Sequence, residues 1–202
     1  MTLEERMLSG KLYDCADETL QARQRELNEL VFDYNNTRPT DGTRRQTLLR
    51  QIFEDMGEGC YIEPPLHANW GSHTHLGNKV YANFNLTLVD DTHIYIGDNV
   101  MFGPNVTLCT AGHPIEPELR RQVYQYNFPI HIEENVWIGA GVIVLPGVTI
   151  GKNSVIGAGS VVTRDIPENV VAMGTPCRVA RPISEWDREY YFRKHRIDEG
   201  LS

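Results

Sequence analysis

An uninterrupted six-residue repeat, beginning at residue 132, constrains the fold of this chain more than any other feature. In blocks of six the segment reads IEENVW, IGAGVI, VLPGVT, IGKNSV, IGAGSV and VTRDIP. An aliphatic residue opens every block, at Ile132, Ile138, Val144, Ile150, Ile156 and Val162. The fifth place of each block holds Val, Ser or Ile, at Val136, Val142, Val148, Ser154, Ser160 and Ile166. Neither a helix, with its 3.6-residue period, nor an alternating strand gives this pattern.

A strict period of six is the signature of a parallel β-helix, a solenoid of short strands. Each block would form a strand and a turn, with its aliphatic residue pointing into the core and Gly, Asn or Asp at the tight corner. Gly139, Gly151 and Gly157 each follow one of the aliphatic residues directly. An ordinary β-rich domain with glycine-rich turns would not hold phase over six blocks, so we predict the solenoid.

Composition and charge exclude several classes of protein. The 202 residues carry a net charge of −8, which gives no reason to expect a nucleic acid or an anionic membrane as partner. The N-terminal sequence MTLEERMLSGKLYD lacks the apolar region of a signal peptide, and no run reaches the ~20 apolar residues of a membrane span. Four scattered cysteines form no CxxC pair, which favours reduced thiols in the cytoplasm; these are Cys15, Cys60, Cys109 and Cys177.

The first 57 residues are polar and predict helices instead of strands. Thr2 and Glu5 have the spacing of a capping box at a first helix start. A second helix is expected to open at Asp17-Glu18 and to bury one face, formed by Leu20, Leu27, Leu30, Val31 and Tyr34. A third is expected from about Asp41 to Met56, ended by Gly57 or Gly59. Their apolar stripes are narrow, so we expect these helices to pack on the solenoid.

The repeat also governs much of the chain between residues 61 and 108, with two interruptions. The β pattern begins at Tyr61 and forms blocks at 76–81, 82–87 and 88–93, and the phase then slips by two residues beside Asp90-Asp91. It disappears over 109–129, a polar loop that contains His113 and three prolines. Insertions in a solenoid map to loops on one face, and long loops in compact domains are often functional. We therefore place a functional site at this loop.

The pattern divides the chain into three parts. Residues 1–58 form a helical segment, residues 59–183 form the β-helix with the loop 109–129, and residues 184–202 form a tail. The tail is rich in charged and aromatic residues over 184–197, which we interpret as a terminal helix that covers the open end of the solenoid. Such caps protect the unpaired edge of the last coil.

Several motifs resemble the maltose/galactoside O-acetyltransferase family of hexapeptide-repeat acyltransferases, and most closely its galactoside enzymes. They are YANFNLTLVDD (81–91), IGDNVMFGPNVTL (96–108), GHP (112–114), NVWIGAGVIVLPGVTIGKNSVIGAGSVVT (135–163) and VAMGTPCRV (171–179). The segment GKLYDCADETL (10–20) is similar as well, so the resemblance spans nearly the whole chain. It implies a mainly β fold, a left-handed parallel β-helix with three blocks per coil, assembled as a homotrimer with active sites between subunits.

The resemblance implies acetyl transfer from acetyl-CoA to a sugar hydroxyl, with the 6-hydroxyl as the expected position and with no metal and no covalent acyl-enzyme. Direct attack by an alcohol on a thioester needs a base, and a neutral imidazole suits that task. His113, in its Gly-His-Pro setting, matches the catalytic base of the family. Asn83 matches the residue that stabilises the oxyanion and meets the acceptor. Asn85 is a nearby competitor, and a turn role is the alternative for both asparagines.

For the acceptor, the resemblance assigns polar groups that would hydrogen-bond sugar hydroxyls. Asp91 matches one such contact, and Tyr81 and Trp70 are candidate walls. An N-terminal carboxylate contact falls on either Asp14 or Asp17. Asn69 stands where the galactoside enzymes carry Ser, so the identity of the sugar stays open.

For CoA, phosphates favour cations, and pantetheine favours backbone amides along an extended strand. Thr163, Arg164, Arg178 and Arg181 match the contacts of the family near the end of the solenoid. Arg164 stands where the galactoside enzymes often have Lys. Ala140 and Ala158 occupy places where a small residue lets pantetheine run along the coil.

Three other functions remain open from the residues. A γ-type carbonic anhydrase uses the same solenoid and binds zinc through three histidines, for which His73, His75 and His113 are candidates. A trimeric β-helix could also serve as a scaffold without catalysis. Within the acyltransferases, the acceptor could be an antibiotic or another compound that is not a sugar.

Overall fold

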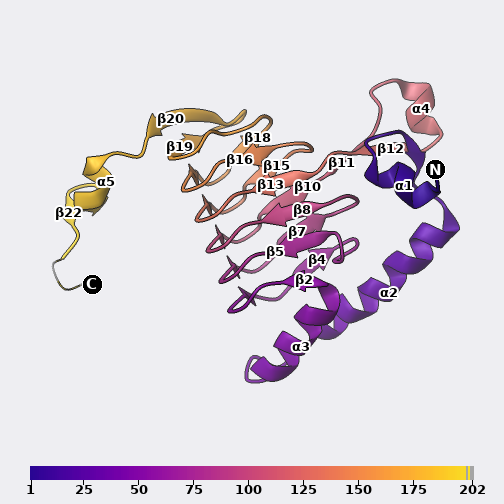
Figure 1. The fold of residues 1–202 in the computed structure, drawn as a ribbon, viewed down its shortest axis with the longest axis horizontal. Coiled ribbons are helices and arrows are strands. Elements are labelled where there is room, and N and C mark those ends of the chain that lie inside the picture. The colour runs from indigo at the N-terminus through magenta and orange to yellow at the C-terminus, as the bar shows by residue number, and fades with distance from the viewer. Residues whose placement is uncertain (199, 201–202) are drawn as a thin grey trace.

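A computed structural model describes residues 1–198 and 200 of the chain. Figure 1 shows a stack of short parallel strands wound into a coil, with helices α2 and α3 against one end and side of the stack. A separate lobe formed by α1, α4 and β12 projects from the middle of the coil. The predicted parallel β-helix is confirmed.

Each coil contributes one strand to each of three sheets. Sheet 1 contains, in spatial order, β18 (Val161–Val162), β15 (Ile143–Val144), β10 (Thr107–Cys109), β7 (Leu86–Val89) and β4 (Leu66–Ala68). Sheet 2 contains β16 (Thr149–Ile150), β13 (Ile130–Ile132), β8 (Ile94–Ile96), β5 (Thr74–Leu76) and β2 (Asp55–Met56). Sheet 3 contains β20 (Arg178–Pro182), β19 (Val170–Met173), β17 (Val155–Ile156), β14 (Trp137–Ile138), β9 (Met101–Phe102), β6 (Tyr81–Ala82) and β3 (Tyr61–Ile62).

The chain passes from sheet 3 to sheet 1, then to sheet 2, and back to sheet 3, which creates three corners. We call the corner between sheets 3 and 1 the Asn83 corner, because residues 83–85 form one of its turns. We call the corner between sheets 1 and 2 the Asp91 corner, because residues 90–93 form one of its turns. The two-residue phase slip and the loop 109–129 both fall at the Asp91 corner.

The residues that open the hexapeptide blocks fill the core, as the pattern predicts. All six are at most 2% exposed, namely Ile132, Ile138, Val144, Ile150, Ile156 and Val162. Gly and Asn occupy the tight corners as predicted, and the glycines that directly follow the aliphatic residues have a different role. A Cβ on Gly139 would lie 2.7 Å from the backbone nitrogen of Ala158 in the next coil, so this glycine permits close coil stacking. The left-handed corner comes later, for example at Gly141 (φ 68).

The predicted helices are present, and one ends earlier than expected. Helix α1 (Leu3–Leu8) begins with the predicted capping box of Thr2 and Glu5, and α2 (Glu18–Asn35) is capped by Asp17. Helix α3 (Gly42–Ile52) does not continue to Met56. Asp55 and Met56 instead pair in parallel with β5, so the β ladder begins before Tyr61. None of the helices that the structure describes has the length and apolarity to cross a membrane.

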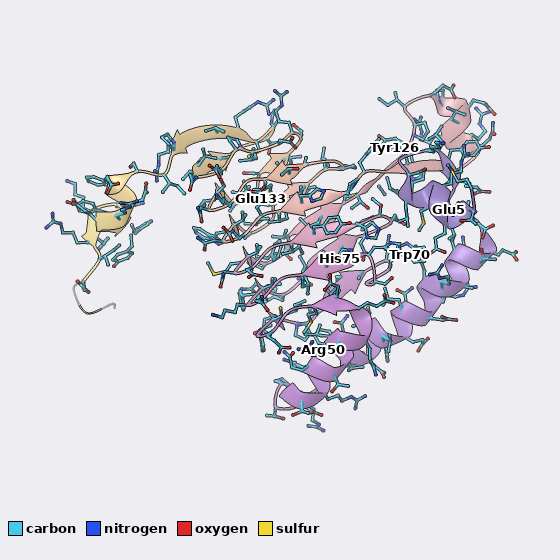
Figure 2. All side chains as sticks on the ribbon, viewed as in Figure 1. Glu5, Arg50, Trp70, His75, Tyr126 and Glu133 are labelled. Carbon is cyan, nitrogen blue, oxygen red and sulfur yellow. The ribbon has the colours of Figure 1, made fainter. Side chains whose placement is uncertain are left out.

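The loop 109–129 has a fold of its own. It contains β11 (Ala111–Gly112), α4 (Pro117–Arg121) and β12 (Tyr124–Asn127), and β12 lies between β11 and the N-terminal strand β1 (Tyr13–Asp14) in an antiparallel sheet. Figure 2 shows Tyr126 of this hairpin next to the helix that carries Glu5. The hairpin and the N-terminal segment therefore form one unit outside the coil.

The prediction of a single terminal helix over 184–197 is wrong. Helix α5 covers only Glu185–Glu189, and β21 (Tyr190–Phe192) and β22 (His195–Arg196) follow as a small antiparallel hairpin. Helix α5 buries no residue, and Figure 1 shows the tail extending away from the coil. Aromatic residues have a high strand propensity, which explains why the Tyr-Tyr-Phe run leaves the helix. Residues 199, 201 and 202 of the predicted tail lie outside the described residues.

Candidate functional site

His113 lies at the start of the hairpin, directly after β11, with its side chain exposed. Its Nδ1 is 2.8 Å from the backbone oxygen of Tyr124 on β12. A carbonyl oxygen only accepts hydrogen bonds, so Nδ1 carries the proton and the lone pair of a neutral ring is on Nε2. The backbone carbonyl of Tyr124 is thus the group that orients this ring.

The two candidate N-terminal carboxylates have different surroundings. Asp17 is the N-cap of α2, and its Oδ1 accepts hydrogen bonds from the backbone nitrogens of Thr19 (2.9 Å) and Leu20 (3.3 Å). Asp14 is exposed on β1, in register with Tyr124 of β12, whose carbonyl holds His113. The structure thus brings Asp14 to the neighbourhood of His113 and uses Asp17 as a helix cap.

A buried polar network, which the sequence analysis missed, fixes this arrangement. The amide nitrogen of Asn127 donates to the backbone oxygens of Met7 (3.1 Å) and Asp91 (3.2 Å) and to the hydroxyl of Tyr13 (3.1 Å). Gln125 donates to the same hydroxyl. The network ties the N-terminal segment, the Asp91 corner and the His113 hairpin together. Its sequence signal is the pair of amides alternating with aromatic residues in YQYNF.

Asp91 faces Asn69 and Trp70 at the Asp91 corner. Its carboxylate accepts hydrogen bonds from the Asn69 amide (3.0 Å) and the Trp70 indole (3.3 Å). Trp70 is only 6% exposed and packs with Met7, Tyr13 and Leu20, so it supports the site from behind and does not form an open wall. The neighbouring Asp90 is fully buried, which raises the pKa of its carboxyl group.

Asn83 lies at the other corner, and the structure separates it from Asn85. Asn85 has a φ of 62° and its amide donates to Asn105 in the next coil (2.9 Å), which is the turn role. The side-chain oxygen of Asn83 accepts from the backbone nitrogen of Phe84 (2.8 Å). Within the described residues its amide nitrogen has no protein acceptor, so two donors remain for a ligand. The partly exposed Tyr81 lies on the adjoining strand β6, and Ala140 and Ala158 belong to the same corner.

The two corners are far apart within one chain. Strand β7 and its flanking residues, from 85 to 90, separate them. Five residue steps of about 3.3 Å each span roughly 16 Å. The chain alone therefore groups Asp14, Asn69, Asp91 and His113 at one corner, and Tyr81, Asn83, Ala140 and Ala158 at the other.

The residues predicted to contact CoA lie toward the C-terminal end of the coil. Thr163 and Arg164 are exposed at the Asp91 corner, after β18. Arg178 and Arg181 belong to β20, all of whose residues are exposed. Arg181 forms a two-pronged ion pair with Asp187, at 2.7 Å for both contacts, and this pairing lowers the pKa of Asp187 to about 2. Arg181 is thus already engaged, whereas Arg164 and Arg178 form no ion pair within the described residues.

Comparison with known proteins decides the family. Residues 6–57 match the maltose acetyltransferase hexapeptide capping motif, and residues 129–164 match the six-repeat bacterial transferase hexapeptide. A galactoside O-acetyltransferase of Lactococcus lactis subsp. lactis (strain IL1403) is 53% identical over 195 residues, which cover 96% of this chain and 94% of that protein. The chain belongs to the maltose/galactoside O-acetyltransferase family.

Solved structures of the family agree closely with this fold. A galactoside acetyltransferase in complex with coenzyme A has a TM-score of 0.95 and 47% identity, over 98% of this chain and 99% of that one. A maltose O-acetyltransferase from Clostridium difficile 630 has a TM-score of 0.89 and 46% identity, over 91% of this chain and 98% of that one. The resemblance drawn from the sequence motifs is confirmed.

The histidines of the zinc alternative do not meet in this member of the family. His75 contacts His93, with Nε2 2.9 Å from Nδ1, and stacks on Tyr95 at a ring distance of 4.7 Å. His73 lies beside His93, at 5.4 Å between ring centres. These rings form a row that begins at the Asp91 corner with His73 and His93 and continues to His75 on β5 of sheet 2, which Figure 2 labels. His113 belongs to the hairpin instead, and no group of three or more potential metal ligands occurs among the described residues.

Proposed function

We propose that the protein transfers an acetyl group from acetyl-CoA to a hydroxyl of a sugar, the 6-hydroxyl of a galactoside, glucoside or maltose-type acceptor. The observation that carries the proposal is the setting of His113. The Tyr124 carbonyl fixes its tautomer with Nε2 as the basic nitrogen, in a hairpin tied to Asp14 and Asp91. High identity to galactoside O-acetyltransferases over the full chain supports the substrate class.

The reaction is a direct acyl transfer. Nε2 of His113 takes the proton of the sugar hydroxyl as its oxygen attacks the carbonyl carbon of the thioester. The resulting oxyanion accepts a hydrogen bond from the free amide nitrogen of Asn83. The carbon–sulfur bond then breaks, and the imidazolium returns the proton to the departing thiolate of CoA. A histidine that begins and ends the cycle neutral needs neither a metal nor an acyl-enzyme.

The acceptor lies at the Asp91 corner in this proposal. The carboxyl group of Asp91, a residue that is 7% exposed, and the exposed carboxyl group of Asp14 accept hydrogen bonds from the sugar hydroxyls, and Asn69 holds Asp91 in orientation. Tyr81 would close the site from the other corner. The phosphates of CoA are met by Arg164 and Arg178, and the exposed Ala158 and partly exposed Ala140 let pantetheine pass close to the backbone.

The complete site requires two chains of a homotrimer. His113 and Asn83 must meet one thioester, yet they occupy corners that a single chain keeps roughly 16 Å apart. A neighbouring copy whose Asn83 corner lies against the Asp91 corner would bring them together. An exposed row on sheet 3 supports such contact, because Tyr61, Tyr81, Met101 and Trp137 lie in register and are 37–51% exposed. A contiguous row of exposed apolar and aromatic side chains favours burial against a partner.

We place this enzyme in the cytoplasm. Its cosubstrate is a cytoplasmic metabolite in the proposed reaction, and all four cysteines are free in the structure. Burial raises the pKa of each of these thiols, which keeps them protonated and unreactive.

The test measures thiol release from acetyl-CoA against a panel of sugars, with the His113→Ala variant as control. Sugar-dependent release that the variant loses supports the proposal and ranks the acceptors. Binding of acetyl-CoA without release for any sugar would contradict the sugar assignment and direct the search to other hydroxyl compounds. Absence of both binding and release would contradict acyl transfer altogether.

A further inference from the structure

A second cavity lies at the N-terminal end of the coil, distinct from the acyl-transfer residues. It has a volume of about 240 Å³ and lies between α2, α3 and β3. Its lining residues are Tyr34, Pro39, Gly42, Arg45, Gln46, Leu49, Tyr61 and Ile62. None of them belongs to the residues assigned above to the base, the acceptor or CoA. Most of the lining is apolar or aromatic, and its one charged side chain is Arg45.

Arg45 is a buried cation without a matching anion. It is 8% exposed, and its Nε donates to the hydroxyl of Thr37 at 2.9 Å. Among the residues that the structure describes, no carboxylate forms an ion pair with it. Its neighbours on the same helix do have such partners, since Arg44 pairs with Asp33 and Arg50 with Glu58. Buried arginines are rare unless they are paired, so the missing anion calls for an explanation.

The terminal nitrogens of Arg45 are available to a ligand of the cavity that Arg45 lines. No fully buried side-chain nitrogen or oxygen of the described residues lacks a hydrogen-bond partner. The terminal nitrogens of Arg45 have no protein acceptor among those residues, so they are not fully buried and keep some accessible surface. Their N–H donors form the flat outer edge of the guanidinium, which matches two oxygens of a carboxylate.

Two other polar side chains of the lining already donate hydrogen bonds to the protein. The Tyr34 hydroxyl donates to the backbone oxygen of Ile62, and the Gln46 amide donates to the backbone oxygen of Cys60 (2.9 Å). The charge of the lining is thus concentrated on one cation, and much of the remaining wall is formed by tyrosine rings, Leu49 and Ile62. A ligand that fits has one anionic end and a small apolar body.

We propose that this cavity binds a small carboxylate, with its two oxygens on the terminal nitrogens of Arg45 and its apolar part between Tyr34 and Tyr61. Such a ligand would join α2 and α3 to the first strand of sheet 3, and binding to the folded state alone raises stability by mass action. The proposal uses none of the residues assigned to the base, the acceptor or CoA, and it shares only Tyr61 with the exposed row proposed to meet a neighbouring chain.

The experiment titrates acetate, propionate and benzoate into the protein by calorimetry, with sodium chloride at equal ionic strength as reference. We expect saturable binding of benzoate with a Kd on the order of 1 mM, the range for a small ligand held by one charged contact. The Arg45→Gln variant should bind at least about tenfold more weakly, and Arg45→Lys, which keeps the charge without the fork, should fall between. The exposed Arg44→Gln is the matched control and should bind like the unmodified protein.

Three results would overturn the proposal. The first is no saturable binding of any carboxylate by the unmodified protein. The second is equal binding by the unmodified and Arg45→Gln proteins, which would place the ligand elsewhere. The third is binding of inorganic phosphate in preference to benzoate, which would show that the apolar wall of the cavity does not contribute to ligand binding. Circular dichroism of Arg45→Lys verifies that its weaker binding does not reflect unfolding, which keeps the test valid if Arg45→Gln fails to fold.

Discussion

The coil over residues 130–166 and the hairpin over residues 110–129 are neighbours in sequence and are stabilised in opposite ways. The coil buries an aliphatic residue in every block and repeats the same parallel pairing from turn to turn. The hairpin instead depends on three polar side chains, Tyr13, Gln125 and Asn127, which connect it to segments more than a hundred residues away.

Because of this difference, the coil provides most of the stability of the fold, and the hairpin positions the proposed catalytic base. The coil is held by many similar apolar contacts, so it offers a rigid frame that no single polar group controls. The hairpin carries His113 and gains its position from a few specific hydrogen bonds, whose loss leaves buried donors or acceptors unsatisfied. The proposed catalytic base is therefore placed where the structure is most specific and least redundant.

The largest effect is expected from removing the base. His113→Ala should lower kcat by roughly 10²–10⁴-fold, the range for loss of a general base. The side chain is exposed, so the coil should be unaffected and the urea unfolding midpoint should not move. Steady-state kinetics and unfolding of the same preparation test this. Turnover near that of the unmodified enzyme would remove His113 from the mechanism.

The opposite pattern is expected from a core position on sheet 2, away from both corners. Ile150 is 0% exposed, and Ile150→Ala should lower the free energy of unfolding by about 2–5 kcal/mol while kcat per folded protein stays unchanged. Ile150→Val is the matched control, with an expected loss of about 0.5–1.5 kcal/mol. Urea unfolding at one fixed protein concentration measures both. A fall in kcat without a loss of stability would contradict the claim that the coil core determines stability and the hairpin determines catalysis.

Asn127→Ala tests the connection between the two regions. Loss of its four side-chain hydrogen bonds should loosen the hairpin and lower kcat/KM for the acceptor by about 10- to 100-fold, the effect of misplacing a catalytic group by about 1 Å. The KM for acetyl-CoA should change little.

Hydrogen exchange provides the structural readout for Asn127→Ala. Amides of 111–127 should exchange faster, and those of 130–166 should not change. The exposed Gln122→Ala, in the same hairpin, is the control and should leave both measurements unaltered. Equal acceleration across coil and hairpin would mean that Asn127 supports the whole fold.

The smallest effect is expected from pH. Burial lowers the pKa of His93, and the charges of His73 and His75 add to this. The unfolded chain, with a histidine pKa near ~6.5, therefore binds the proton first, and this group destabilises the folded state as pH falls below that value. Above about pH 7 His93 is neutral in both the folded and the unfolded chain, so it contributes nothing to the pH dependence of stability.

Unfolding midpoints at pH 7 and pH 5 test the pH effect, with His93→Gln compared with the unmodified protein. The variant should lose less stability on acidification. His67→Gln, an exposed histidine outside the row, should behave like the unmodified protein. An identical acid loss in His93→Gln would exclude His93 as the cause.

The coil could be predicted from the sequence because its information is local and periodic. One aliphatic residue per block determines which side chain enters the core, and the phase slip at Asp90-Asp91 marks the corner at which we propose the acceptor site. The third helix was extended too far because Asp55 and Met56 become a strand only through pairing with His75 and Leu76. Such long-range pairing leaves no signal in the local pattern.

The site could be predicted only in part, for related reasons. His113 is visible as a histidine in an inserted loop, but its partner is the backbone carbonyl of Tyr124, and a carbonyl has no sequence signature. Asp14 and Asp17 could not be told apart until the structure showed that Asp17 caps a helix. Arg181 was assigned to CoA without knowledge of Asp187, which engages its guanidinium.

The most direct test of the account is complementation between two inactive variants. Asn83→Ala should lower kcat more than it raises the KM for acetyl-CoA, because an oxyanion donor acts mainly in the transition state. His113→Ala and Asn83→Ala are then unfolded, mixed in equal amounts and refolded. If each site takes His113 from one chain and Asn83 from its neighbour, about half of the sites in a random mixture receive an intact His113, and about half of those also receive an intact Asn83. About a quarter of the unmodified activity should therefore return. Mixed oligomers that form and stay inactive would contradict a site shared between chains.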